Sequence, residues 1–380
     1  MTAAAMLDDA SVIVCCGSGG VGKTTTAAVL GIEAALHGRR AVVVTIDPAR
    51  RLADALGLAD GLPAEPARVD LSTLVDTSDD GHGKRGGESG ELWAMMLDTA
   101  ATFDGLVHRY ADDEQQATRI LENPFYRNIA GSLSGTQEYM AAEMLHSLHS
   151  DDRFDLVVVD TPPSRNALDF LEAPGVLSRF LDHRLFKLLM LPARGGLRVL
   201  SPVTQPVLRT IGKVVGSDVL ADSVAFFQAF AGMETGFRER ADEVVALIRA
   251  PETSFVVVAS PRHDTIDEAV WFSEQLEAQG VQVTAALVNR CHPVFGDGSA
   301  ADAAAVATDL LDRGRTDLSA LWANVAHLRG LREGEQRVVG PLSAAVGDGR
   351  VELLPLLDRD VHDLDGLARI GDHLFGRSSA

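Results

Sequence analysis

The feature that most constrains this chain is a glycine-rich segment at residues 17–24, GSGGVGKT, which fits the pattern G-x-x-x-x-G-K-[ST]. A continuous apolar run at residues 11–16 precedes it, and a helix predicted over residues 24–37 follows it, with Gly38 as the C-terminal cap. Small residues allow successive backbone N–H groups to turn inward around an anion, and the helix N-terminus adds positive dipole character. This strand–loop–helix context predicts a phosphate-binding P-loop.

Two side chains of this loop have predicted chemical roles. Lys23 is expected to reach the β- and γ-phosphates of a nucleotide, and the hydroxyl of Thr24 is expected to hold Mg²⁺. The chain has no N-K-x-D motif of the kind that reads guanine, which favours ATP over GTP. The residues of this segment predicted to bind the nucleotide are Gly19, Gly20, Val21, Gly22, Lys23, Thr24 and Thr25.

Two aspartates follow buried-type strands. Asp160 comes after the run LVVV, the position from which a P-loop protein supports Mg²⁺, and the alternative is a helix-capping residue. Asp47 comes after residues 42–46, and it either orients an attacking water or forms a turn with Pro48; its position alone does not separate the two. The predicted catalytic residues are Lys23 and Asp47, and the predicted metal-site residues are Thr24, Asp47 and Asp160.

Strand-like and helix-like segments alternate along the chain, which predicts an α/β fold with a doubly wound, mostly parallel sheet. Fully apolar strands are typical of sheets covered by helices on both faces. The strands are expected at residues 11–16, 41–46, 68–75, 155–159, 255–259, 283–288 and 351–354, with further helices at 267–279 and 360–375.

Two long stretches, residues 91–150 and 165–249, have mostly helical periodicity and interrupt the strand pattern. We expect them to form a helical subdomain inserted into one P-loop ATPase domain that spans residues 1–380. The expected bounds are 1–90, 135–165 and 251–380 for the core, and 91–134 and 166–250 for the helical subdomain.

Charge and cysteine content exclude several classes of function. The formal net charge of −20 argues against a protein that coats nucleic acid. The three cysteines (Cys15, Cys16 and Cys291) form no C-x-x-C pair, which excludes a zinc knuckle and a disulfide framework and fits a reducing compartment. The N-terminus does not resemble a signal peptide, and no run of about 18 apolar residues is present. We therefore expect a cytoplasmic protein, with peripheral membrane contact as a variant of that expectation.

Four segments resemble one family. Residues 17–26 (GSGGVGKTTT), 45–54 (TIDPARRLAD), 155–163 (DLVVVDTPP) and 287–290 (LVNR) recur in this order in ArsA-type ATPases, which include the arsenite-pump ATPase and the targeting ATPase for tail-anchored membrane proteins. The resemblance implies the dimeric P-loop class with a deviant Walker A motif that also contains MinD, ParA and the nitrogenase iron protein. It covers nearly the whole chain.

The resemblance implies roles for individual residues. Asp47 matches the switch I aspartate that activates water, and Asp160 matches the switch II aspartate near Mg²⁺. Asn289 matches the asparagine that reads adenine, and an amide can pair with both the donor and the acceptor edge of that base. Without the resemblance, Asn289 fits a turn residue after a strand equally well.

Ser18 departs from the family pattern, which has lysine at this position. The resemblance implies that this lysine crosses a dimer interface to the partner's phosphates. Three alternatives follow: the chain forms a heterodimer with a paralogue that keeps the lysine, another basic residue replaces it, or the chain binds ATP and hydrolyses it poorly. The basic candidates are Arg50, Arg51 and Arg165. We favour the heterodimer over a homodimer.

The helical stretches contain apolar segments at residues 185–191 and 219–237, which form either a groove for a hydrophobic or membrane-protein client or the core of the subdomain. The family's dimer-linking zinc motif and its metalloid-binding cysteines are absent from the sequence. We therefore expect a Mg-dependent, ATP-hydrolysing dimeric switch protein with no zinc or metalloid site. The alternative is a low-turnover, ATP-binding regulatory subunit of a lysine-bearing paralogue.

Overall fold

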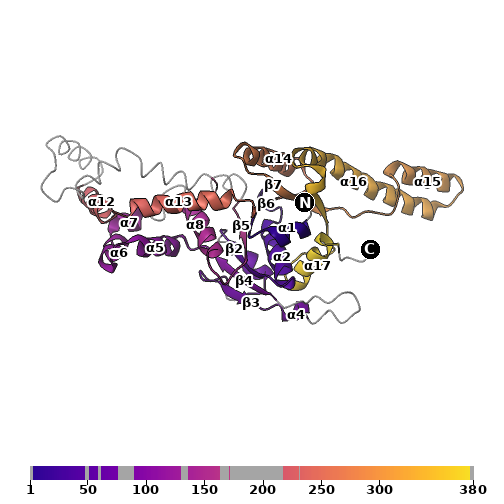
Figure 1. Cartoon of the computed structure of the whole chain (residues 1–380). Coiled ribbons are helices and arrows are strands. Elements are labelled where there is room, and N and C mark those ends of the chain that lie inside the picture. The colour runs from indigo at the N-terminus through magenta and orange to yellow at the C-terminus, as the bar shows by residue number, and fades with distance from the viewer. Residues whose placement is uncertain are drawn as a thin grey trace. The chain divides into compact units, whose positions relative to one another are not determined.

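The computed structural model describes residues 3–47, 51–58, 61–75, 90–129, 136–162, 171, 217–230 and 232–376. Its centre is an eight-stranded sheet with the strand order β3-β4-β2-β5-β1-β6-β7-β8 (Figure 1). The strands are β1 (Val12–Gly17), β2 (Arg40–Thr45), β3 (Ala67–Val69), β4 (Glu91–Met96), β5 (Leu156–Asp160), β6 (Thr253–Ala259), β7 (Val283–Cys291) and β8 (Val351–Pro355). The predicted α/β class with a mostly parallel sheet is confirmed.

Strand β5 lies between the two strands that begin the chain's sheet. Val159 pairs with Val14 of β1 on one side and with Val44 of β2 on the other, in parallel register. Every residue of β1, β5 and β6 is buried, because helices cover both faces of this part of the sheet. Only the pairing of β3 with β4 is antiparallel among the strand pairs of the described chain. Parallel order places the carboxyl ends of β1, β2, β5, β6 and β7 at one edge.

Helices α2 (Lys23–Leu36) and α17 (Leu364–Leu374) pack against each other and close one hydrophobic core. That core includes Leu30 of α2, Val43 of β2 and Leu367 of α17, each fully buried. Helix α14 (His263–Ala278) packs against β1, β6 and β7. The shorter elements of this region are α1 (Ala3–Asp9), α3 (Arg51–Ala55), α4 (Ser72–Val75) and the 3-10 turn Asp348–Arg350.

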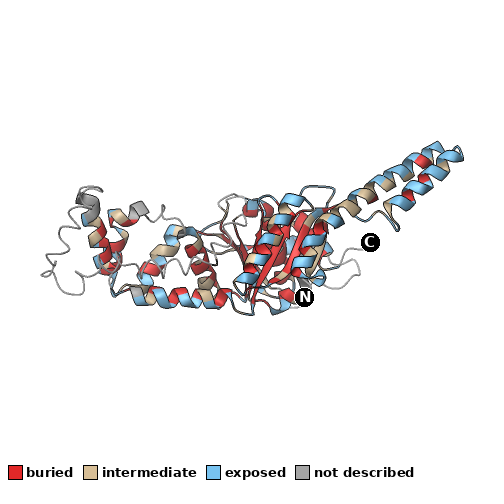
Figure 2. Ribbon diagram, turned by 90° about the horizontal axis from the view of Figure 1, so that it is seen from above, coloured by how far each residue is buried: buried red, intermediate tan, exposed pale blue. Residues whose placement is uncertain are grey.

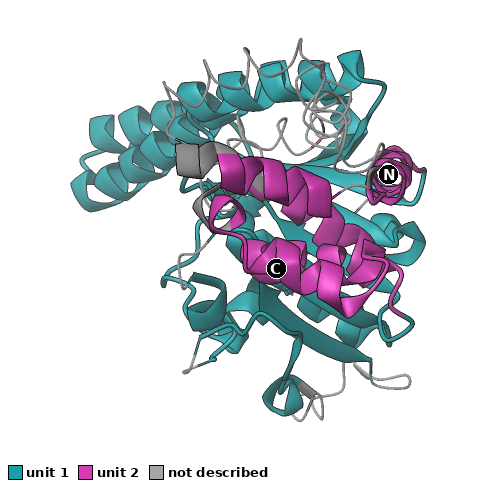
Figure 3. Ribbon diagram, turned by 90° about the vertical axis from the view of Figure 1, so that its left-hand side faces the viewer, with its two compact units in different colours: residues 1–96, 152–165, 251–380 teal, residues 97–151, 166–250 magenta. Residues whose placement is uncertain are grey.

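The chain divides into two compact units (Figure 3). Unit 1 comprises Met1–Met96, Asp152–Arg165 and Pro251–Ala380 and contains the sheet; unit 2 comprises Leu97–Asp151 and Asn166–Ala250 and is helical where it is described. Its helices are α5 (Thr99–Tyr110), α6 (Glu114–Leu121), α7 (Pro124–Ile129), α8 (Thr136–His149), α12 (Ser217–Ala229) and α13 (Glu234–Ile248).

Unit 2 has an aromatic core. Phe226, Phe230 and Phe237 are buried, and neighbouring rings among them lie 5.8 Å and 4.9 Å apart between centroids. Met233 is buried as well. Residues 219–237 were interpreted either as part of a client groove or as core of the helical subdomain. The burial of these four side chains favours the core. The other apolar segment, residues 185–191, lies outside the described residues, as do the prolines and glycines around it.

Helices α15 (Ala300–Asp312) and α16 (Thr316–Val346) form an antiparallel hairpin that extends away from the sheet within unit 1 (Figure 2). The hairpin turns at Gly314, which has a φ of 71°, a value that glycine adopts without strain. At about 1.5 Å per residue, α16 is roughly 46 Å long. Helix α16 also packs on α14. The sequence interpretation contained no element here.

Three expectations are wrong in their details. Residues 91–96 form strand β4, not the start of a helix, and Leu92, Ala94 and Met95 are buried where this segment pairs with β2. Residues 136–149, expected in the core, form α8 of unit 2, where they pack on α5 and α13. The strand expected at 68–75 ends at Val69, because Asp70 accepts a hydrogen bond from the Ser72 N–H and turns the chain into α4.

No helix within the described part of the chain has the length and apolar character needed to cross a membrane.

Candidate active site

The P-loop joins the end of β1 to the start of α2, and two of its glycines are required by close packing. A Cβ on Gly17 would lie 2.1 Å from the carbonyl oxygen of Val258, and a Cβ on Gly22 would lie 2.4 Å from Nδ2 of Asn289. Gly22 also has a φ of 104° at the N-terminus of α2. Side chains at either position would therefore push the loop away from β6 or β7.

Lys23 is the first residue of α2, and only 8 % of it is exposed. Its Nζ donates a 2.8 Å hydrogen bond to the carbonyl oxygen of Ser18, across the mouth of the loop. Burial lowers the pKa of Lys23, while the carboxylates of Asp160, Asp47 and Glu268 act in the opposite direction. The ammonium group is thus a poorly solvated cation in a loop of backbone N–H groups, which is suited to binding phosphate.

Asp160 ends β5 directly behind the P-loop and is 1 % exposed. Its Oδ2 accepts hydrogen bonds from the hydroxyls of Thr24 at 2.7 Å and Thr45 at 3.0 Å. Burial raises the pKa of Asp160, and these two hydrogen bonds and the charge of Lys23 partly offset that rise. Thr45 also accepts a hydrogen bond from the backbone N–H of Asp47, at 3.2 Å, so one hydroxyl joins the ends of β2 and β5.

The second carboxylate oxygen of Asp160 bears on whether Mg²⁺ fits this site. Asp160 Oδ1 is buried and has no hydrogen-bond partner among the residues that the structure describes. A buried, unsatisfied carboxylate oxygen is costly, and a hydrated divalent cation beside Thr24 supplies both charge and donors for it. The residues present therefore fit Mg²⁺, with Thr24 as the ligand and Asp160 and Asp47 beside it.

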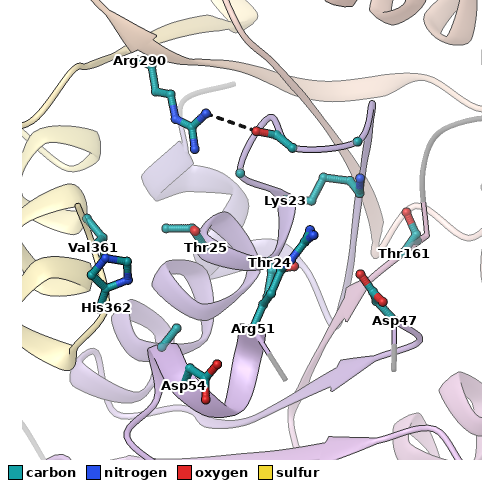
Figure 4. Close-up of a pocket in the computed structure, with 14 residues that line it drawn as sticks. Lys23, Thr24, Thr25, Asp47, Arg51, Asp54, Thr161, Arg290, Val361 and His362 are labelled. Carbon is teal, nitrogen blue, oxygen red and sulfur yellow. Dashed lines mark hydrogen bonds between the residues drawn. The ribbon is translucent and has the colours of Figure 1, made fainter. Parts of the chain in front are cut away.

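A cavity of about 350 Å³ opens at this edge of the sheet (Figure 4). At one end it is lined by Lys23, Thr24, Asp47 and Thr161, and the other end is bounded by Val361 and His362 from the loop before α17. Among the predicted nucleotide-binding residues, the cavity is lined by Gly19, Gly20, Gly22, Lys23, Thr24 and Thr25. Val21, Asp160 and Asn289 are not among the residues that line the cavity, and their predicted roles stay predictions.

Asn289 and Arg290, at the end of β7, both contact the P-loop backbone. Asn289 Nδ2 donates to the carbonyl of Val21 at 3.0 Å, and Arg290 Nη1 donates to the carbonyl of Gly20 at 3.3 Å (Figure 4). In this structure Asn289 therefore supports the loop with one of its two amide hydrogens. The NH₂ group has a second hydrogen, and the predicted role of Asn289 in binding adenine stays a prediction.

Ser18, the position at which the family pattern has lysine, points at a carboxylate. Its hydroxyl donates a 2.7 Å hydrogen bond to Glu268 of α14, and Ser18 is 7 % exposed. Of the basic residues named as substitutes for the lysine, Arg51 lines the cavity. Arg50 and Arg165 lie outside the described residues.

Sequence reasoning missed several residues of the site. Thr45 and Thr161 are ordinary strand-end threonines in the sequence, and only the adjacency of β2, β5 and β1 gives them a place beside Asp160. For Arg290, the only sequence feature that could have indicated a place in the site is its position after an expected strand. The other cavity-lining residues that were not predicted to bind nucleotide are Arg51, Asp54, Ala55, Val361 and His362.

The two cysteines beside the P-loop take no part in this chemistry. Cys15 and Cys16 are fully buried in β1. Burial raises the pKa of both thiols, that of Cys16 to about 12. They are therefore protonated near neutral pH and behave as small apolar side chains.

A P-loop at the end of a central parallel strand, with a lysine, a threonine and two strand-end aspartates around it, defines a P-loop ATPase of the α/β class. The model of the anion-transporting ATPase family (ArsA) matches residues 10–304. The chain belongs to this family, and the resemblance stated from the sequence is confirmed.

Proteins similar to this chain have names that agree with the family. It is 22 % identical over 367 residues, 96 % of this chain and 78 % of the relative, to the putative arsenical pump-driving ATPase 1 of Aquifex aeolicus. It is 28 % identical over 276 residues to the ATPase GET3 of Rhodotorula glutinis, covering 72 % and 68 % of the two chains. The get3 ATPase of Schizosaccharomyces japonicus is 27 % identical over 278 residues, 72 % of each chain. This chain is accordingly an ATPase.

Proposed function

We propose that this chain is a Mg-dependent, ATP-hydrolysing switch protein that works as a dimer and whose nucleotide state moves its helical unit. The observation that carries the proposal is the convergence of Lys23, Thr24 and Asp47 on one cavity, with Asp160 bonded to Thr24 from behind. These groups come from the ends of β1, β2 and β5, and a triphosphate is the ligand that needs all of them together.

Each side chain has one task in the proposed reaction. Lys23 leaves the Ser18 carbonyl and binds the terminal phosphates, since an anion competes better for an ammonium group than a peptide carbonyl does. Asp47 orients the attacking water and accepts its proton. Thr24 and Asp160 would hold Mg²⁺, which would neutralise charge on the phosphoryl oxygens.

The switch itself rests on Thr45. Its hydroxyl bonds both to Asp160 and to the backbone N–H of Asp47, so a change at either aspartate is transmitted to the other. Loops held by a terminal phosphate and its metal are released when that phosphate leaves. We propose that this release moves the helical unit and that the helical unit binds a hydrophobic or membrane-protein client. Residues 185–191, a predicted part of the client groove, lie outside the described residues.

A second candidate is a low-turnover, ATP-binding regulatory subunit, and Ser18 favours it. A serine that donates to Glu268 of its own chain carries no charge to a partner's phosphates. Loss of such a cation in trans costs about 10³–10⁵ in rate in comparable systems. We therefore favour a heterodimer with a paralogue that keeps the lysine, in which Ser18 weakens the partner's site and leaves its own site dependent on the partner.

Calorimetry with Mg-ATP and a phosphate-release assay test the two candidates. Wild-type protein should bind Mg-ATP, and Lys23→Ala should lose that binding by at least about 100-fold because the cation of the anion site is gone. Phosphate release is then measured on the chain alone and with a lysine-bearing paralogue. Turnover in either setting supports the switch, ATP binding without turnover in both supports the regulatory subunit, and micromolar affinity in Lys23→Ala contradicts the phosphate site.

A further inference from the structure

Arg290 has an unusual backbone for an arginine. Its φ is 63°, and it is the single non-glycine residue with positive φ in the described part of the chain. An L-residue in this region costs about 1–2 kcal/mol relative to ordinary backbone conformations. The pairing of β7 with β8 shifts register between Val288 and Cys291, so the strand bulges where Arg290 lies. The fold therefore maintains a strained residue at this edge of the site, which suggests a function for its side chain.

The bulge directs the Arg290 side chain over the P-loop. Its Nη1 donates to the Gly20 carbonyl at 3.3 Å, a long hydrogen bond for a charged donor, and the residue is exposed (Figure 4). The other four guanidinium hydrogens make no hydrogen bond to the residues that the structure describes. Little binding energy is therefore lost when a ligand repositions this group.

The contact with Gly20 shows on which side of the loop the guanidinium lies. In a trans peptide the carbonyl of one residue and the N–H of the next point in opposite directions. The Val21 N–H belongs to the loop of amides that faces the phosphates, so the Gly20 carbonyl faces away from them. A group bonded to that carbonyl is on the outer side of the loop, away from the phosphate tail.

The cavity gives the position of the rest of the nucleotide. A triphosphate bound at the end that contains Lys23 and Asp47 would leave the nucleoside to extend past Thr25 toward Val361 and His362. Arg290 lines this same end of the cavity. The guanidinium is planar and weakly hydrated, and it stacks well on aromatic faces, whereas an ammonium group does not present such a plane.

We propose that Arg290 is a base-binding residue: its guanidinium stacks on the purine of the bound nucleotide, opposite Val361 and His362. The inference rests on the proposed function, since it needs a nucleotide whose phosphates occupy the P-loop. Stacking requires a purine ring but tolerates different ring substituents, so Arg290 contributes to affinity. Hydrogen bonding, as predicted for Asn289, determines which base is bound.

Calorimetry with two probes tests this assignment. One probe is Mg-ATP, and the other is Mg-tripolyphosphate, which has the phosphate tail and no base. The variants are Arg290→Asn, because asparagine tolerates positive φ, and Arg290→Lys, which keeps the charge without the plane. Arg313→Ala, at an exposed position of the α15–α16 hairpin, is the matched control for loss of one positive charge.

Both Arg290 variants should bind Mg-ATP about tenfold or more weakly than wild type, the scale for the loss of one stacked base. Both should bind Mg-tripolyphosphate as wild type does, and Arg313→Ala should match wild type with both probes. Equal loss for the two probes would make Arg290 a support of the phosphate loop, and unchanged ATP affinity would remove it from the site; either result overturns the inference. Wild-type protein that binds neither probe would instead overturn the proposed function.

Discussion

Single residues at the carboxyl ends of β2 and β5 carry most of the proposed chemistry. Thr45 bonds to Asp160 and to the N–H of Asp47, so the position of each aspartate depends on the other. The bond to the backbone N–H of Asp47 leaves the Asp47 side chain at the cavity wall. A substitution at Asp47 should therefore change chemistry and leave nucleotide binding largely intact.

We predict that Asp47→Asn binds Mg-ATP within about threefold of wild type and hydrolyses it at least about 100-fold more slowly, because an amide does not accept the proton of water. Single-turnover phosphate release, measured on the complex with its partner, checks the rate, and calorimetry checks the affinity. Asp309→Asn, in the exposed hairpin, is the control. Unchanged turnover in Asp47→Asn would remove this residue from the mechanism.

Asp160 gives a prediction about pH. Burial raises the pKa of Asp160 in the folded chain. The folded protein is therefore destabilised at pH values above the pKa of an unfolded aspartate, about 3.9, where the carboxyl group ionises more readily in the unfolded chain. Below that pH the group is protonated in both states, and this loss of stability disappears. Asp160→Asn should therefore raise the Tm of nucleotide-free, metal-free protein at pH 7 while abolishing hydrolysis. The gain should shrink as pH falls toward 4.

Thermal unfolding in EDTA, monitored by circular dichroism at several pH values, measures this effect. Asp8→Asn, an exposed aspartate of α1, controls for the loss of one negative charge. A lower Tm for Asp160→Asn at pH 7 would show that the carboxylate stabilises the resting fold.

The site residues that belong to a contiguous sequence motif could be predicted from the sequence. Lys23, Thr24 and Asp47 belong to contiguous patterns, and all three line the cavity. Thr45 and Arg290 could not be found this way. A threonine at a strand end and an arginine after one are common, and what distinguishes them is the neighbouring strand and a backbone bulge, both of which are properties of the folded sheet.

At the scale of elements, unit 2 depends on a buried ion pair between two of its helices. Arg240 of α13 donates through Nε and Nη2 to both oxygens of Glu143 of α8, at 2.7 to 2.9 Å, and both side chains are at most 5 % exposed. Removing one member of such a pair leaves a buried charge without compensation.

We predict that Arg240→Ala lowers the free energy of unfolding by about 3–5 kcal/mol, and that Glu143→Leu combined with Arg240→Met recovers much of that loss. Urea denaturation followed by circular dichroism measures both variants. Arg313→Ala, which breaks an exposed pair with Asp309, should change stability by less than about 1 kcal/mol. If Arg240→Ala lowers the free energy of unfolding by less than about 1 kcal/mol, the pair positions helices α8 and α13 without stabilising the fold.

The fold was predictable where periodicity is unambiguous. Strands β1, β2, β5, β6 and β7 are continuous apolar runs, and their order alternates with helices. Strand β4 was missed because six residues of mixed burial beside a long helical stretch share features of both patterns. The α15–α16 hairpin was missed because the buried residues of α15 are the alanines Ala303 and Ala307, while larger apolar residues of the hairpin, Leu311 and Leu321 among them, are exposed. Small residues give a weak hydrophobic signal.

At the scale of the whole molecule, the contact between Ser18 and Glu268 makes the dimer testable. A lysine placed at position 18 would have a carboxylate of its own chain within reach. We predict that Ser18→Lys raises turnover only in a dimer, and that Ser18→Lys with Glu268→Gln raises it further, because the lysine is then free to reach the partner's phosphates.

Phosphate release by the co-purified complex, with its stoichiometry checked by light scattering, measures this effect. Glu268→Gln alone is the control, and it should not raise turnover, since it supplies no cation. Faster hydrolysis by Ser18→Lys in a preparation shown to be monomeric would contradict a role across a subunit interface.

The place of β5 in the sheet has a consequence for how the chain is made. Strands β1 and β2 leave the ribosome early, yet they never pair with each other, because β5 occupies the position between them. The chain from Thr45 to Leu156 must be synthesised before that gap is filled. Until then, two of the most apolar strands have open edges, which are templates for aggregation. We expect such a nascent chain to need protection from aggregation during translation, and the proposed nucleotide site stays incomplete until Asp160 has been added.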